Sequence, residues 1–188
     1  MQLSFWKPVA KTLLAAALAV GSQAATLTFS SPSPVSAGQS LSVTVGVELQ
    51  AGESLTAYQM DILFPSFLEA ESVEELGYFA ANGIFFSPGF IDNHLLTVSF
   101  IASALSGLDE MVTTGPLFRV NFSALGPGSG TVTADPLSVV LLDAQFLDLA
   151  FDIQSGNVEV AEAGAPVPEP STLLLVFTAF GLLALKRR

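Results

Sequence analysis

The chain of 188 residues carries seventeen acidic residues against six basic ones, a formal net charge of −11, and it contains no cysteine. The lack of cysteine excludes disulfides, thiol catalysis and cysteine-ligated metal sites. Binding to a phosphate backbone needs clustered lysine and arginine, so the charge balance also argues against nucleic acid as a partner.

The N-terminal segment, residues 1–24, has the pattern of a secretory signal peptide. Two lysines precede an apolar run over residues 13–20, and small residues lead to a cleavage site between Ala24 and Ala25. The run is too short to span a membrane, which takes roughly 20 residues. We therefore expect this segment to direct export and to be removed.

Residues 25–160 show the alternation that is typical of half-buried β-strands. The clearest example is residues 41–49, where leucine and valine alternate strictly with polar residues or glycine. Further strands are expected at residues 25–29, 57–64, 91–102, 117–123, 131–134, 137–142, 147–151 and 156–160. Residues 66–88 have no clear period, and we expect a short helix or an irregular crossover there. The pattern predicts one all-β sandwich domain of about nine strands.

A linker at residues 161–166 precedes a C-terminal segment, residues 167–188, of three consecutive parts. These are the triplet Pro168, Glu169 and Pro170, an uncharged apolar run over residues 173–185, and the basic end Lys186, Arg187 and Arg188. The run predicts a C-terminal hydrophobic helix, although its thirteen residues make it marginal as a permanent anchor. The basic end favours the cytoplasmic side, so we expect transient anchoring in the inner membrane.

Removal of both ends changes the charge balance further. The remaining domain keeps sixteen of the seventeen acids and one basic residue, Arg119, a net charge of −15. Such acidity keeps an exported domain soluble, and it leaves divalent cations open as ligands. Asp143, Asp148 and Asp152 are the candidate calcium ligands because they crowd one strand-loop region. No other cofactor is expected.

The residues that could perform catalysis are few. The single histidine, His94, is expected in an exposed loop, and it cannot build a typical zinc site without cysteines. Glycoside hydrolysis needs two suitably spaced carboxylates, for which Asp61 is the best lone candidate. A sugar-cleaving domain would also use tryptophan, yet the only one, Trp6, lies in the signal peptide. We therefore expect no enzymatic activity, and a carbohydrate-active enzyme stays as the lesser alternative.

Aromatic residues gather in the least regular stretch of the domain. Tyr78, Phe79, Phe85 and Phe86 are the candidate ligand platform, since flat aromatic faces stack on sugar rings. The same residues also suit the core of a sandwich that lacks disulfides. The sequence leaves both interpretations open.

The C-terminal segment resembles the PEP-CTERM sorting signal, with the Pro-Glu-Pro triplet followed by Ser171 and Thr172, then the apolar run and the basic end. The resemblance implies that an exosortase, a membrane-embedded cysteine protease, recognises and removes the tail. It also implies delivery to the cell surface or the extracellular matrix, in an exopolysaccharide or biofilm setting.

The domain itself resembles cohesin-like domains over about residues 25–160. The resemblance rests on Pro32, Val35 and Gly38, then on Leu55, Tyr58, Ile62, Phe64, Pro65 and Leu68, and on the closing Gly156, Asn157, Val158 and Val160. It implies a nine-stranded jelly-roll sandwich related to cellulose-binding modules. We expect a binding or structural module whose partner is polysaccharide or a surface protein. The alternative that the family suggests is a module that binds a dockerin-like partner.

Overall fold

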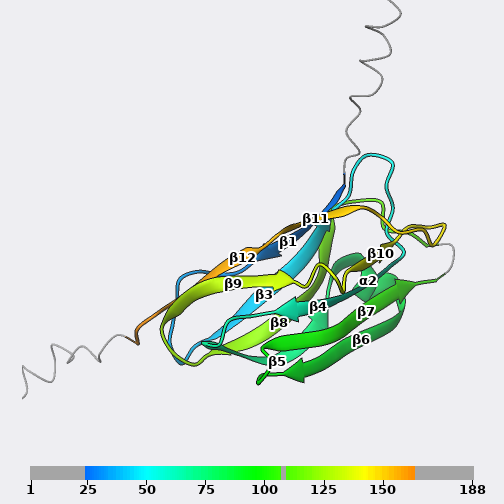
Figure 1. Ribbon diagram of the computed structural model, residues 1–188. Coiled ribbons are helices and arrows are strands. Elements are labelled where there is room, and N and C mark those ends of the chain that lie inside the picture. Colours follow the sequence, from blue (N-terminus) through cyan, green and yellow to red (C-terminus); the bar gives the residue numbers. More distant parts are fainter. Residues whose placement is uncertain (1–23, 107–108, 164–188) are drawn as a thin grey trace, which may run out of the picture.

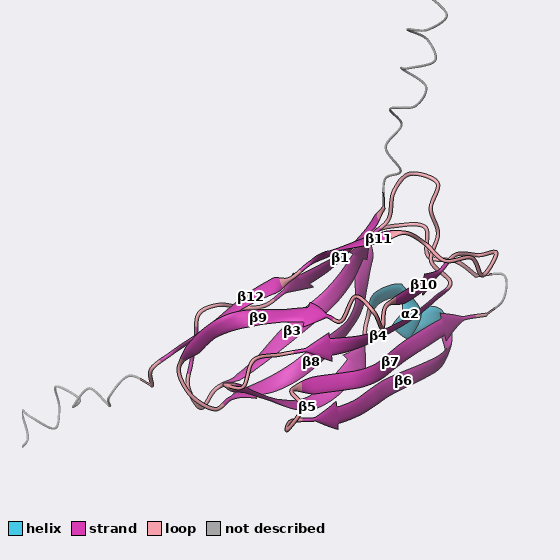
Figure 2. Cartoon of the chain, in the orientation of Figure 1, coloured by secondary structure: helices cyan, strands magenta, loops and turns pink. Residues whose placement is uncertain are grey.

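The computed structural model describes residues 24–106 and 109–163, so the expected signal peptide and C-terminal sorting segment lie outside the described residues. The described part forms a β-sandwich of twelve strands with one short helix (Figure 1 and Figure 2). The elements are β1 (Ala25–Ser30), β2 (Val35–Ser36), β3 (Ser40–Glu48), β4 (Ala57–Leu63), β5 (Leu68–Glu75), α2 (Gly77–Asn82), β6 (Gly83–Asp92), β7 (Thr97–Leu105), β8 (Gly115–Ala124), β9 (Gly128–Ala134), β10 (Val140–Leu142), β11 (Phe151–Gln154) and β12 (Gly156–Ala161). No helix within these two ranges has the length and apolar character needed to cross a membrane.

The strands form two sheets. The five-stranded sheet has the order β11-β1-β3-β8-β5. The seven-stranded sheet has the order β2-β12-β9-β4-β7-β6, and β10 pairs with residues 57–59 of β4, on the edge that β9 occupies at residues 62–63. The consecutive strands β11 and β12 belong to different sheets, because β11 pairs in parallel with β1 whereas β12 pairs with β9. This change of sheet joins the two layers at the end of the domain.

The core lies between the two sheets, and the predicted alternation explains how it is filled. Val43 and Val45 on β3 are fully buried, as the period of two requires. Phe118 and Phe122 on β8 supply the largest side chains of the five-stranded sheet. Tyr58 on β4 stacks on Phe118 with ring centroids 5.8 Å apart. The sequence-based prediction of an all-β sandwich is therefore confirmed.

The stretch at residues 66–88 contains the short helix α2, one of the two alternatives expected there, but it also contains β5 and the first part of β6, which were not expected. Strand β5 was missed because a β-bulge lies between Ala70 and Ser72. The inward residues Leu68, Ala70 and Val73 are therefore spaced by two and then by three. Strand β6 was missed because it is a sheet edge whose residues are largely exposed on both faces.

Two other strand boundaries also differ from the sequence-based expectation. The segment at residues 91–102 contains a turn between β6 and β7, because the Asp92 carboxylate accepts hydrogen bonds from the backbone N–H groups of His94 and Leu95. The strand expected at residues 147–151 begins only at Phe151.

Candidate functional site

The outer face of the five-stranded sheet is polar, and its side chains satisfy one another. Asn121 on β8 donates to the Ser72 hydroxyl at 3.0 Å and to the Glu74 carboxylate at 2.9 Å. Arg119 donates to Glu74 from its Nε at 3.1 Å. Hydrogen bonds from Arg119 and Asn121 hold the pKa of the Glu74 carboxyl below its ordinary value. This face therefore presents paired polar groups and offers no apolar contact surface.

The outer face of the seven-stranded sheet is polar over β9 and β12, where Ser129, Thr131 and Glu159 point outward, and it becomes more apolar over β6, β7 and β10. Ile101 and Ser103 on β7 are buried, so the alternating neighbours Ala102 and Ala104 face outward. Ala104 pairs with Phe85, whereas Ala102 has the polar neighbours Gln59 and Ser87. We name this surface the apolar face and define it by Phe85, Phe100, Ala102, Ala104 and Val140.

The apolar face is exposed and nearly free of charge. Phe85 is 56% exposed, Phe100 57% and Val140 39%. Strands β4, β6, β7 and β10 contain no basic residue, and their acids are Asp61 and Asp92 alone. Large apolar side chains that are exposed together on one face often mark a contact surface.

Phe100 is held in an unusual backbone conformation at one end of this face. Its φ is 60°, in the left-handed region that bulky residues rarely adopt. The Asp61 carboxylate accepts a hydrogen bond from the Phe100 N–H at 2.8 Å, and the Ser87 hydroxyl donates to the Phe100 backbone oxygen at 3.2 Å. On the facing strand Gly89 also has positive φ, 78°, and a Cβ there would lie 2.4 Å from the Ser99 backbone oxygen. Three strands thus fix the irregularity from which the Phe100 ring projects.

The geometry at Asp61 bears on the alternative of a carbohydrate-active enzyme. The Asp61 carboxylate accepts a hydrogen bond from the Phe100 N–H, and the Asp61 N–H donates to the Ser138 hydroxyl at 2.8 Å. His94 lies exposed in the β6–β7 turn. In the described part of the chain the His94 side chain makes no hydrogen bond to a carboxylate or hydroxyl, so it is not placed as the base of a serine nucleophile there.

The four aromatic residues predicted as a ligand platform do not form one surface. Phe79 is fully buried, with its ring edge-on to Tyr58 at a centroid distance of 5.0 Å. Phe86 is half-buried and packs against the core. Only Tyr78, 40% exposed, and Phe85 remain accessible. The platform interpretation is therefore wrong for Phe79, which is a core residue.

Burial also affects Tyr58, whose hydroxyl has no hydrogen-bond partner among the described residues. Burial raises the pKa of the Tyr58 phenol far above its ordinary value of 10.0, and the negative charge of Glu75 adds to the shift. The phenol is therefore neutral under all physiological conditions and acts as a packing group.

The candidate calcium ligands are likewise not gathered into a site. One oxygen of the Asp143 carboxylate accepts hydrogen bonds from the backbone N–H groups of Gln145 and Leu147, at 2.8 and 2.9 Å, and so closes its own loop. Asp148 bridges to Leu142, whereas Asp152 lies on β11 beside β1. Across residues 24–106 and 109–163, no group of three or more acidic or histidine side chains is placed to hold a metal ion.

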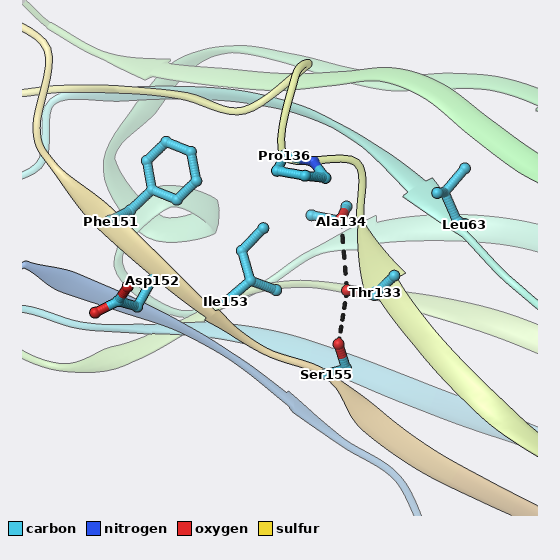
Figure 3. A pocket seen from close by; sticks show the side chains of 8 residues that line it. All are labelled: Leu63, Thr133, Ala134, Pro136, Phe151, Asp152, Ile153 and Ser155. Atoms are coloured by element: carbon cyan, nitrogen blue, oxygen red, sulfur yellow. Dashed lines mark hydrogen bonds between the residues drawn. The ribbon is translucent and has the colours of Figure 1, made fainter.

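A shallow pocket of about 370 Å³ lies beside Asp152, where β11 leaves the five-stranded sheet (Figure 3). Phe151, Ile153 and Pro136 surround it with apolar side chains. The Ser155 hydroxyl donates to the Thr133 hydroxyl at 2.8 Å at its rim. The polar groups are thus paired with each other, and the pocket offers packing surface with no arrangement for chemistry.

The exposed aromatic residue of the apolar face on β7, Phe100, was not singled out by sequence reasoning. One signal was present, since residues 97–105 carry apolar side chains in both phases of the alternation. A half-buried strand with one wet face would not show this pattern. The outward apolar residues of this strand, Phe100, Ala102 and Ala104, are those that lie on the apolar face.

Comparison with known proteins identifies the fold. No protein-family model and no curated protein sequence matches the chain. Solved structures do match. A cohesin module from a family 33 glycoside hydrolase of Clostridium perfringens is 12% identical with a TM-score of 0.62, over 74% of this chain and 98% of that one. A non-cellulosomal cohesin from Archaeoglobus fulgidus is 18% identical with a TM-score of 0.59, over 74% and 92%.

A third match comes from a complex. The type I cohesin–dockerin complex from Clostridium thermocellum contains a chain that is 12% identical, with a TM-score of 0.57, over 74% of this chain and all of that one. Likeness at these identities shows the fold, and the domain has the β-sandwich fold of cohesin modules. The expected cohesin-like architecture is confirmed.

Proposed function

We propose that the domain is a non-enzymatic protein-binding module and that the apolar face is its contact surface. The observation that carries the proposal is Phe100, whose side chain is more than half exposed and whose backbone is fixed by hydrogen bonds to Asp61 and Ser87. An aromatic group on a fixed backbone loses little conformational entropy on binding, and aromatic groups are enriched among the residues that dominate the energy of protein interfaces.

The composition of the apolar face favours a protein as its partner. The centres of protein interfaces are depleted in charge and enriched in aromatic residues. The small side chains of Ala102 and Ala104 lie beside the rings of Phe85 and Phe100, so the backbone or a helix of a partner can approach the sheet closely. A sugar would instead require several free hydrogen-bonding groups around the rings, whereas Asp61 and Ser87 beside Phe100 are already bonded to its backbone.

The partner class that we propose is a dockerin-like module. Two of the similar structures are cohesins in complex with dockerins, from Clostridium thermocellum and Acetivibrio cellulolyticus. Their fold supports the proposal, and the unpaired apolar face of this chain gives it a physical location. A direct role in binding polysaccharide is the second reading and is decided by the same experiment.

The test is binding to a panel of purified dockerin modules, with Phe100→Asp as the variant. Aspartate tolerates a positive φ better than phenylalanine does, so the variant keeps the fold while it places a charge on the face. Truncation of an interface hot spot costs at least about 2 kcal/mol, so we expect binding to weaken about 30-fold or more if Phe100 is one. Leu125→Asp is the matched control, because Leu125 is 61% exposed but lies in the β8–β9 connection.

The results of this experiment distinguish protein binding at the apolar face from polysaccharide binding. Binding that Phe100→Asp abolishes and Leu125→Asp leaves intact supports the proposal. Equal binding by the wild type and Phe100→Asp would show that the apolar face is not the contact surface. Binding to a glycan array, with no dockerin bound, would favour the polysaccharide reading.

The proposed cellular setting rests on the two ends of the sequence. We propose that residues 1–24 export the protein and that an exosortase removes residues 167–188 at the Pro-Glu-Pro triplet, which releases the domain to the cell surface or the extracellular matrix. Intact-mass measurement of the mature protein tests this route. A mature protein that keeps its basic end in cells with an active exosortase would contradict it.

A further inference from the structure

The free edges of the two sheets meet along one side of the sandwich, where β5 and β6 run in opposite directions. They are tied at both ends. At one end the Asn93 carboxamide accepts from the Ala70 N–H at 2.9 Å and donates to the Ala70 backbone oxygen at 3.1 Å. At the other end the Ser103 hydroxyl bonds the Glu75 carboxylate and the backbone oxygen of Phe85. The edges are separated between these ties.

A groove of about 450 Å³ fills this interval. Ser72 and Val73 line it from β5, and Pro88, Phe90 and Ile91 line it from β6. From Ala70 to Glu75 the strand advances about 17 Å at roughly 3.3 Å per residue. The groove therefore has room for an extended segment of about four residues.

The backbone of β5 can still pair along this edge. Ala70 directs both its N–H and its C=O away from β8, and Asn93 occupies them as a peptide group of another strand would. Beyond the bulge, the Leu76 N–H donates to the Leu117 oxygen at 2.8 Å, so the backbone groups of Leu76 point toward β8. Alternation from Leu76 turns the backbone groups of Val73 outward, into the groove. A further strand beside β5 would pair at Ala70, where Asn93 already makes both hydrogen bonds, and at Val73, whose backbone groups are open to a partner.

The opposing edge is not suited to pairing. Pro88 lies in β6 at the groove and has no N–H to donate. Proline on an edge strand is a common device against further pairing. An incoming segment must therefore pair with β5, while β6 supplies apolar side chains against which it packs.

The charges around the groove define the occupant. Glu69, Glu71 and Glu74 point outward along β5, and they are joined there by one cation, Arg119, which pairs with Glu74. Inside the groove the facing groups are the apolar side chains of Phe90 and Ile91. A complementary strand places lysine or arginine on its outer face and apolar residues on its inner face, in alternation. The net charge of this chain repels a second copy of itself.

We propose that β5 is a strand-addition site for an extended segment of another protein in which basic and apolar residues alternate. The segment pairs with the backbone of Val73, next to the hydrogen bonds that Asn93 makes with Ala70. Its basic side chains lie beside Glu69 and Glu71. Main-chain hydrogen bonds supply the affinity, and the groove and the acidic row supply the specificity. This site is separate from the apolar face and does not depend on its role.

The test uses the full-length protein and a blocked heptapeptide of alternating lysine and valine. Fluorescence anisotropy measures affinity at low salt, and amide hydrogen exchange measured by NMR reports on Val73. We expect saturable binding and slower exchange of the Val73 amide. The double variant Glu69→Lys/Glu71→Lys should weaken binding about tenfold or more, since two attractive charges become repulsive. The matched control is Glu48→Lys/Glu159→Lys, which makes the same change in net charge away from the groove.

Two further peptides separate strand addition from simple charge attraction. The same peptide with N-methylated valines keeps its charges but loses backbone donors, and we expect it not to bind. A peptide of alternating glutamate and valine should not bind either. Equal binding of the N-methylated peptide, an unchanged Val73 exchange rate at saturation, or equal weakening by both double variants would overturn the proposal.

Discussion

Replacement of Phe79 by alanine distinguishes a core residue from a surface ligand platform. Phe79 is the one buried side chain of α2, a six-residue helix whose N-terminus has no side-chain cap. So short a helix does not form without tertiary contacts. The Phe79 ring fills the space next to Tyr58, with the two rings at an interplanar angle of 70°. Its removal opens a cavity and releases the helix from the sheet.

The size of the effect follows from this burial. Phenylalanine-to-alanine changes in cores cost about 3–5 kcal/mol, and the lost edge-to-face contact places Phe79→Ala near the middle of that range, about 4 kcal/mol. For a domain of this length the melting temperature falls about 3 °C per kcal/mol, so we expect a decrease of about 12 °C. The matched variant Phe85→Ala removes a ring that is 56% exposed, and it should cost less than about 1 kcal/mol.

Urea unfolding followed by circular dichroism measures both free energies, and the slope of the transition shows whether the compactness of either state has changed. Equal losses for Phe79→Ala and Phe85→Ala, or a loss below about 1 kcal/mol for Phe79→Ala, would refute the packing argument. They would indicate that α2 lies open in solution and that its aromatic residues are available to a ligand.

Three other predictions follow from contacts on the two sheets. Asp61→Ala leaves the Phe100 N–H without its acceptor and should lower the free energy of unfolding by about 1–2 kcal/mol in urea titrations; an unchanged value would show that this bond is absent in solution. Gly89→Ala sets a Cβ 2.4 Å from a backbone oxygen of β7 at a φ of 78°, so we expect a loss of at least about 2 kcal/mol, and a neutral result would contradict the strained geometry. Because Arg119 and Asn121 lower the pKa of Glu74, its stabilising effect is full above the ordinary carboxyl pKa of 4.5 and is lost as pH falls through the lower folded value. The stability difference between the wild type and Glu74→Gln should therefore shrink on acidification, and a difference independent of pH would exclude this ion pair as its source.

The two outer faces of the sandwich have different chemical characters, and this difference organises the proposals. Hydrogen bonds among side chains cover the outside of the five-stranded sheet, as at Asn121. The outside of the seven-stranded sheet leaves Phe85, Phe100 and Val140 exposed over β6, β7 and β10. The acidic row on β5 then borders a groove with apolar walls at the margin between the sheets. One domain therefore offers a flat contact surface and a separate edge for an extended chain.

Strand β3 shows what can be inferred from the sequence alone. Its valines alternate with polar residues, and Val43 and Val45 are buried as that period requires. The inference succeeds because successive side chains of a regular strand point to opposite faces, so that periodicity fixes both the element and its orientation. The cohesin-like pattern of the early strands was sufficient for the fold class for the same reason.

Strand β5 shows where such inference stops. A bulge between Ala70 and Ser72 shifts the phase by one residue, and the acidic segment consequently has no readable period. Phe79 and Phe85 lie in the same irregular stretch, and nothing local separates a core ring from an exposed one. Phe79 is buried because α2 packs its ring against Tyr58, and Phe85 is exposed because β6 is a sheet edge.

The sequence by itself determined the all-β class, the alternating strands and the acidity of the domain, because these follow from local periodicity and composition. Only the tertiary structure decided which apolar residues remain exposed. Phe100 projects from a left-handed bulge that Asp61 stabilises from the neighbouring strand. The partner of that bulge lies 39 positions away in the chain, and contacts of this kind leave no local pattern. The candidate sites therefore lie where the regular alternation is broken by neighbours that are distant in sequence.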